Sequence, residues 1–131
     1  MRYMLDTNTA SYVIKDNDAV RKHLLKVPMH EVCISVITEA ELLFGAAKNS
    51  SNAGLQTAVR EFLLRLDILP WATEAARKYA LLRAQLESHG KVMGNMDLLI
   101  AAHALAVNCT LVTNDRAFGH INELRLANWM R

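Results

Sequence analysis

The sequence predicts an α/β protein in which a short parallel sheet is flanked by helices. Brief apolar or β-branched runs at 3–5, 32–34 and 110–112 do not alternate with polar residues, which is typical of strands buried on both faces. Stretches with helical periodicity separate these runs. The chain has only two prolines and five glycines, so we expect long helices joined by short connections.

Two further strands have weak sequence signals, whereas the first long helix has a strong one. Short apolar runs at 68–69 and 124–126 are the weaker strand candidates. The segment 55–66 repeats apolar side chains at spacings of three and four residues, which predicts an amphipathic helix. Either Ser51 or Asn52 can cap its start, because both side chains accept hydrogen bonds from free backbone N–H groups.

Two more helices are expected in the second half of the chain. One runs from Thr73, a plausible N-cap, to Ser88, and Gly90 stands just beyond it as a stop signal. The other covers 96–107 with Asn95 as its cap. Because the first half of that helix is apolar nearly all round, we expect it to be buried.

Length and composition set the broad class of protein. The 131 residues correspond to a single domain, 1–131, since domains usually hold about 100 to 200 residues. Hydrophobic residues make up 52% and charged residues 21%, as in ordinary globular proteins. The formal net charge of +2 is too small to indicate polyanion binding by itself. A nucleic-acid site, if present, has to be local.

Cysteine usage and the N-terminus bear on the compartment. Cys33 and Cys109 show neither a CxxC motif nor zinc spacing, so we predict small buried side chains in a reducing environment. The first residues lack the apolar segment of a signal peptide. The longest apolar stretch, 98–107, is short for a membrane span and contains His103. We therefore expect a cytoplasmic protein with no membrane partner.

Acidic residues follow the strands at the edge where parallel sheets bind ligands. Asp6 comes directly after the first strand, and Asp115 follows the strand at 110–112. Glu41 lies on the helix after the second strand, and Asp97 lies in the first turn of the last helix. The topology brings these four acids towards one edge of the sheet.

Four converging carboxylates would be unstable as bare charges. Two of them about 4 Å apart repel by about 4 kcal/mol at an effective dielectric constant of about 20. Neighbouring Thr, Asn and Ser side chains and the absence of Cys or His favour Mg²⁺, or Mn²⁺, over zinc. Such ions activate water and clamp phosphodiester oxygens, so the pattern indicates metal-assisted phosphodiester hydrolysis.

These residues also carry a resemblance to a known family. It rests on four ordered blocks between residues 3 and 118, which are Met-Leu-Asp6-Thr-Asn8, Ile-Ser35-x-x-Thr38-x-x-Glu41-Leu-x-x-Gly45, Gly94-x-x-Asp97-x-x-Ile-Ala-Ala and Leu-Val-Thr113-Asn-Asp115-x-x-Phe118. The chain resembles the PIN-domain nucleases and is similar in size and order to VapC-type toxins of bacterial toxin–antitoxin systems. The resemblance implies a three-layer PIN-like sandwich, a Mg²⁺-dependent endoribonuclease and a small antitoxin that silences it.

The resemblance also assigns roles to individual residues. It implies that the catalytic and metal-binding acids are Asp6, Glu41, Asp97 and Asp115. The family's auxiliary polar positions match Asn8, Thr113 and, more loosely, Ser35. Cleavage would leave 3′-hydroxyl and 5′-phosphate ends.

Substrate and partners follow from the same resemblance. A structured RNA such as a tRNA loop is the expected substrate, and cations flanking the blocks are candidates for phosphate contacts, namely Lys15, Lys48, Lys91 and Arg116. A VapB-like antitoxin is the expected protein partner, and DNA would be contacted only through it. We also expect a homodimer, formed through the helix over 55–66 and the helix that starts at Thr73.

Each candidate acid also has a purely structural interpretation. Asp6 can cap a helix that begins near Thr9, and Asp97 gains from the helix dipole in any case. Thr38 and Glu41 have the spacing of a capping box, and Glu39 is a competing acid two residues earlier. His103 is expected in the core or an interface, because it lies about 240° round the helix from Asp97.

Two other functions compete with the nuclease. One is a non-catalytic PIN-fold module that binds RNA or the antitoxin without cleavage. The other is a phosphatase with a nucleophilic Asp after its first strand, but such enzymes usually show Asp-x-Asp, and the second position is Asn8 here.

Overall fold

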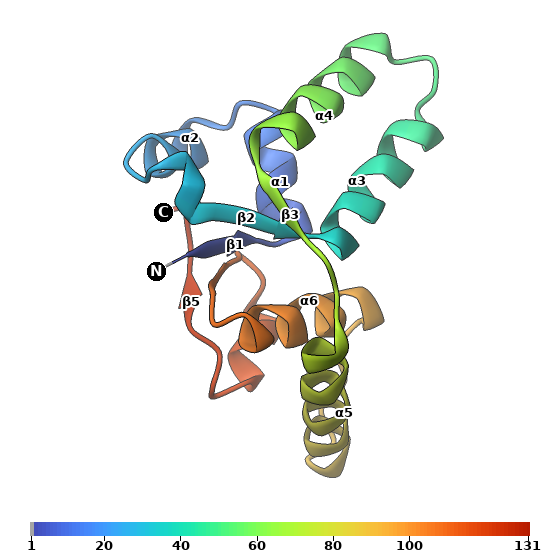
Figure 1. Cartoon of the computed structure of the whole chain (residues 1–131), viewed down its shortest axis with the longest axis vertical. Coiled ribbons are helices and arrows are strands. Elements are labelled where there is room, and N and C mark those ends of the chain that lie inside the picture. Colours follow the sequence, from blue (N-terminus) through green and yellow to red (C-terminus); the bar gives the residue numbers. More distant parts are fainter. Residues whose placement is uncertain (1) are drawn as a thin grey trace.

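A computed structural model describes residues 2–131 (Figure 1). Its sheet has five parallel strands in the order β3-β2-β1-β4-β5. The strands are β1 Tyr3–Leu5, β2 Val32–Ser35, β3 Asp67–Leu69, β4 Thr110–Val112 and β5 Leu126–Ala127. The predicted α/β class is confirmed, because every strand pair is parallel and the connections between strands are largely helical.

The helices cover the two faces of the sheet unequally. Figure 1 shows α1 to α4 on one side of the strands and α5 and α6 on the other. Their bounds are α1 Thr7–Ile14, α2 Asp18–Leu24, α3 Val36–Lys48, α4 Ala53–Arg65, α5 Thr73–Ser88 and α6 Asn95–Ala106, with short 3₁₀ helices η1 Met29–Glu31 and η2 Arg116–His120. Each face has its own apolar core, one with Phe62 of α4 and one with Ile100 of α6. The result is a three-layer sandwich.

The helix starts agree with the sequence to within one residue. Asn52 caps α4 as predicted, since its side-chain oxygen accepts the Leu55 N–H at 3.0 Å. The predicted caps Thr73 and Asn95 instead become the first helical residues, because the extended residue before each helix is Ala72 or Gly94. Neither of those two positions supplies a side-chain cap.

The ends of two other elements are also informative. Gly90 follows the end of α5 as the predicted stop signal. Its φ of +68° lies in a backbone region that favours glycine. The last strand is shifted from the predicted 124–126 to Leu126–Ala127. Leu124 turns into the core instead, where it is 6% exposed.

The connectivity places a crevice at one end of the sheet. From the central strand β1 the chain moves outward through β2 and β3, then returns to β4 on the other side of β1. The strand order therefore reverses between β1 and β4, and ligands of open parallel sheets bind beyond the carboxyl ends of strands at such a point. The Asp6 N–H donates to the Val112 carbonyl at 3.1 Å, which joins the two strand ends directly.

Several buried groups behave as the sequence predicts. Cys33 and Cys109 are buried and free, with their sulfur atoms 3.8 Å apart. His103 is 1% exposed and belongs to the interior. Between residues 2 and 131, none of the helices is both long enough and apolar enough to cross a bilayer.

Candidate metal centre at the carboxyl end of the sheet

Asp6 is the most firmly held of the four acids. It is 3% exposed and sits at the N-cap of α1, where Oδ1 accepts the Thr9 N–H at 2.8 Å. Oδ2 accepts the hydroxyl of Thr113 at 2.6 Å. The structural interpretation of Asp6 as a cap is therefore confirmed. Capping alone does not account for the second, charge-assisted bond from the far strand.

Thr113 connects Asp6 to Asp115. It follows β4, is 5% exposed, and its Oγ1 accepts the Asp115 N–H at 3.0 Å while donating to Asp6. Asp115 in turn caps η2, since Oδ1 accepts the Ala117 N–H at 2.9 Å. The other Asp115 oxygen makes no hydrogen bond within residues 2–131. Thr113 thus fixes the relative position of two of the acids.

The start of α3 positions Glu41. Ser35 caps this helix, since its hydroxyl accepts the Ile37 N–H at 3.0 Å, and Thr38 lies inside the helix. The alternative interpretation of Thr38 and Glu41 as a capping box is therefore excluded. Its Oε1 accepts the hydroxyl of Thr7, from the first turn of α1. This bond brings the carboxylate towards the segment that carries Asp6.

The pKa of Asp97 shows that the other three acids act on it electrostatically. It lies in the first turn of α6. Burial, followed by the negative charges of Asp115, Asp6 and Glu41, raises its pKa to about 6. Because a helix N-terminus favours a carboxylate, the dipole of α6 opposes this shift. The four predicted acids are therefore close enough to act on one another electrostatically.

Within residues 2–131, the four acids are not close enough together to form a preformed metal-binding group. Across the described chain, no three His, Cys, Asp or Glu side chains stand together as a ready-made metal-binding group. The available donors are carboxylate oxygens flanked by threonine hydroxyls, which is the chemistry that hard divalent cations prefer. A cation would also relieve the repulsion recorded in the raised pKa of Asp97, so the residues fit such an ion.

Three contacts around the acids were not expected from the sequence. Thr7 holds Glu41, and the buried Thr9 hydroxyl donates to the Val112 carbonyl at 3.0 Å. His103 of α6 lies with Nδ1 2.7 Å from the hydroxyl of Ser35. The only sequence signal for Thr7 and Thr9 is the run of three polar residues after Asp6. No local sequence pattern indicates that Ser35 contacts His103.

The remaining predicted residues divide into near and distant groups. Asn8 is exposed in the first turn of α1, and Arg116 is exposed directly after Asp115. Lys15 caps the far end of α1 and Lys48 ends α3, each roughly 10 Å or more from its acid at about 1.5 Å per residue. Lys91 lies beyond α5, beside a pocket described below.

The fold and the four acids can now be compared with known proteins. The family model described as PIN domain matches residues 3–124. The chain belongs to the PIN domain family. Among curated relatives, "Ribonuclease VapC2" of Rickettsia felis is 42% identical over 132 residues, covering 98% of each chain. The "tRNA(fMet)-specific endonuclease VapC" of Shigella flexneri is 32% identical over 130 residues, again with 98% of both chains.

Solved structures agree with this family. The VapBC2 complex of Rickettsia felis, bound to a DNA fragment from its promoter, contains a chain with a TM-score of 0.90 and 40% identity. The match covers 98% of this chain and 99% of that one. This PIN domain is therefore a nuclease of the VapC ribonuclease type, as the resemblance implied, and PIN-domain ribonucleases use a divalent metal.

Proposed function

We propose that this chain is a Mg²⁺-dependent endoribonuclease toxin that hydrolyses phosphodiester bonds of structured RNA. The observation that carries the proposal is the pKa of Asp97, which three other carboxylates help to raise. Such mutual repulsion is costly unless the site normally holds a cation. The proposal keeps Asp6, Glu41, Asp97 and Asp115 as the catalytic acids.

The same four acids would hold Mg²⁺, with Mn²⁺ as an alternative. When bound, such an ion lowers the pKa of a water molecule and neutralises charge that develops on the phosphodiester. With a pKa of about 6, Asp97 is mostly ionised at neutral pH and is therefore competent as a ligand. Within residues 2–131, one oxygen of Asp115 and the second oxygen of Glu41 make no hydrogen bond to the protein and remain available.

The chain's own residues would orient the acids and the substrate. The Thr9 N–H and the Thr113 hydroxyl fix the plane of the Asp6 carboxylate before any ligand arrives. The Thr7 hydroxyl does the same for Glu41. Asn8 and Arg116, exposed beside Asp6 and Asp115, would contact phosphate oxygens next to the bond that is cut. Lys15 and Lys48 stand further out and would contribute less.

A tRNA is the substrate class that we favour. One curated relative carries the name of a tRNA(fMet)-specific endonuclease over 98% of both chains, which supports this choice. The modest charge of +2 agrees with recognition through local contacts and RNA shape rather than a broad basic surface. The activity would be exerted in the cytoplasm, where the tRNA is.

The proposed protein partner is a VapB-like antitoxin. Several structural neighbours are toxin–antitoxin complexes, and the Rickettsia felis complex is bound to promoter DNA, which supports this partner. A segment of the antitoxin would cover the acidic edge and silence the enzyme. Contact with DNA would occur only through the antitoxin. We further propose a homodimer through α4 and α5, the helices predicted for this role.

Cleavage of purified total tRNA tests the proposed activity. We expect cutting with Mg²⁺ and none with excess EDTA, and no cutting by the Asp97→Asn protein in either condition. The exposed acid Asp18 at the start of α2 offers a matched control, so Asp18→Asn should cleave like the wild type. A folded wild-type protein that leaves every RNA intact with Mg²⁺ and Mn²⁺ would favour the non-catalytic binding module instead.

A further inference from the structure

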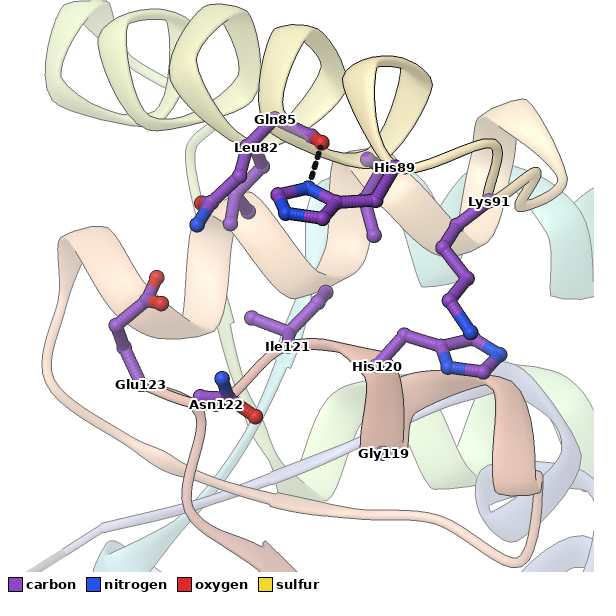
Figure 2. A pocket seen from close by; sticks show the side chains of 10 residues that line it. Leu82, Gln85, His89, Lys91, Gly119, His120, Ile121, Asn122 and Glu123 are labelled. Atoms are coloured by element: carbon purple, nitrogen blue, oxygen red, sulfur yellow. Dashed lines mark hydrogen bonds between the residues drawn. The ribbon is translucent and has the colours of Figure 1, made fainter.

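A second pocket lies outside the acidic site, between the last turn of α5 and the segment after η2 (Figure 2). It has a volume of about 330 Å³, at the lower end of the usual range for small-molecule sites, about 300 to 1,000 Å³. Apolar side chains from α5 and from Ile121 form part of its lining. This size suits one small planar group rather than an extended chain.

The polar side chains around this pocket have unused hydrogen-bonding groups. Within residues 2–131, the side chains of Gln85, Lys91, His120, Asn122 and Glu123 make no hydrogen bond or ion pair with the protein. Figure 2 shows Gln85, Asn122 and Glu123 at one end of the pocket and Lys91 and His120 at the other, with Ile121 between them. Two carboxamides, a carboxylate, an ammonium and an imidazole therefore remain free to bind a ligand.

His89 adds an oriented ring to the same pocket. Its Nδ1 donates to the Gln85 carbonyl at 2.8 Å, which closes the end of α5 and fixes the imidazole against the helix. With Nδ1 engaged in this way, Nε2 is left for another partner. In Figure 2 the ring lies over the pocket, opposite Ile121. An aromatic plane above an apolar floor is the arrangement in which a nucleobase stacks.

The charges in the pocket are separated. Figure 2 shows Lys91 reaching towards His120 on one side, with Glu123 and Asn122 on the other. The first side offers donors to a phosphate group. The second side offers a carboxylate and amides, which accept hydrogen bonds from the exocyclic amino groups of adenine, cytosine and guanine. The polarity of the pocket therefore matches a nucleotide with an amino-bearing base.

The pocket is also close to the candidate active site along the chain. Its wall at His120 is the last residue of η2, and the cap of η2 is Asp115. At about 2 Å per residue for a 3₁₀ helix, the backbones of these two residues lie about 10 Å apart. Neighbouring nucleotides of one bound RNA strand span such a separation.

We propose that the pocket formed by His89, Lys91, His120 and Glu123 binds one unstacked nucleotide of the RNA substrate, with an amino-bearing base. This proposal rests on the proposed ribonuclease function and extends it to a specificity site. Bases in RNA loops can turn outward and stack on side chains, which is how proteins read single-stranded positions. The pocket would select where the RNA lies relative to the four acids.

Nucleoside monophosphates test the pocket without any cleavage. The wild-type protein in EDTA would be titrated with AMP, CMP, GMP, UMP and inorganic phosphate, and the imidazole NMR signals of His89 and His120 followed. We expect saturable shifts at both rings with the amino-bearing nucleotides, roughly fivefold tighter than with UMP. Equal shifts with phosphate alone, or none with any nucleotide, would overturn the proposal.

RNA binding then tests the link to the substrate. In the inactive Asp97→Asn background, His120→Ala and Lys91→Ala should each weaken tRNA binding roughly fivefold or more. The matched controls His30→Ala and Lys26→Ala change exposed residues elsewhere and should bind as the background protein does. All of these positions are exposed, so the variants should fold.

The two proposals fail in different ways. Equal tRNA affinity for His120→Ala and His30→Ala would overturn the pocket assignment and leave the ribonuclease standing. A background protein that binds no RNA, together with wild-type protein that cleaves none, would overturn the proposed function and with it the RNA assignment of the pocket.

Discussion

At the scale of single residues, Thr113 shows how one hydroxyl organises two acids. It donates to the nearly buried Asp6 and accepts from the backbone of Asp115, so both acids depend on it. The sequence marked Thr113 only as an auxiliary polar position. Its hydrogen bond to Asp6 depends on the pairing of β1 with β4, and no local sequence pattern reveals that pairing.

Two substitutions of Thr113 distinguish what its hydroxyl contributes to stability from what the shape of its side chain contributes. Thr113→Val removes a charge-assisted bond to a buried carboxylate and should cost about 2 kcal/mol of unfolding free energy. Thr113→Ser keeps the hydroxyl and should lose less than about 1 kcal/mol. Urea unfolding measures both. Equal stability of the two variants would mean that the bond to Asp6 contributes nothing.

Asp97 makes the stability of the protein depend on pH. Its folded pKa of about 6 lies above the ordinary value near 3.8, so the folded state binds the proton more tightly. Stability should therefore fall as pH rises from about 4 to 6 and stay low above that range.

The variant Asp97→Asn removes this penalty. After allowance for solvent screening, it should be about 1 to 2 kcal/mol more stable than the wild type at pH 7.5 without divalent ions. The gain should be much smaller near pH 4, because there Asp97 is almost fully protonated in the folded state and partly protonated in the unfolded state. Thermal unfolding at the two pH values measures it, and a gain of the same size at pH 4 would contradict the electrostatic cause.

At the scale of elements, helix starts determine where the acids lie. Asp6 and Asp115 are themselves caps, while Ser35 caps the helix that carries Glu41 and also contacts His103 of α6. The sequence narrowed the cap of α4 to Ser51 or Asn52, because polar residues directly before an amphipathic run are a clear signal, and the structure selects Asn52. The sequence left a capping box at Thr38 and Glu41 open as an alternative for α3, because Ser35 also belongs to β2 and strand pairing decides where the helix begins.

A pair of capping variants tests this coupling. Ser35→Ala should lower stability by about 1 to 2 kcal/mol, since it removes a cap and the partner of His103, and it should also slow RNA cleavage. Asn52→Ala removes the cap of α4, which carries no acid of the site, and should cost about 1 kcal/mol with cleavage unchanged. Equal cleavage by both variants would argue against a role for Ser35 in placing Glu41.

At the scale of the whole molecule, the strand order explains why distant acids meet. The sequence predicted the strands and their parallel arrangement, because continuous apolar runs signal burial on both faces. The order with β1 between β2 and β4 could not be read from those runs. The sequence grouped the four acids because the carboxyl ends of parallel strands share one edge whatever the strand order, and this grouping stays a prediction. The threonine bonds to Asp6 and Glu41 require the actual neighbours.

The proposed homodimer is also a property of the whole molecule. Leu64 of α4 and Leu81 of α5 are 81% and 69% exposed and would lie in the proposed interface. Leu64→Glu and Leu81→Glu should shift sedimentation at micromolar concentration from dimer to monomer. Leu25→Glu, at an equally exposed leucine after α2, is the control. A wild type that sediments as a monomer would contradict the dimer.

The charges of Asp6, Glu41 and Asp115 act on Asp97, and the NMR signal of the Asp97 carboxyl carbon measures this effect directly. Its NMR titration should give a pKa of about 6 without divalent ions and a clearly lower value in Mg²⁺, because the cation favours the carboxylate. At a fixed pH, Mg²⁺ should leave the carboxyl signal of Asp18, on the exposed start of α2, unchanged. An ordinary pKa for Asp97 that Mg²⁺ does not move would contradict the four-carboxylate metal site.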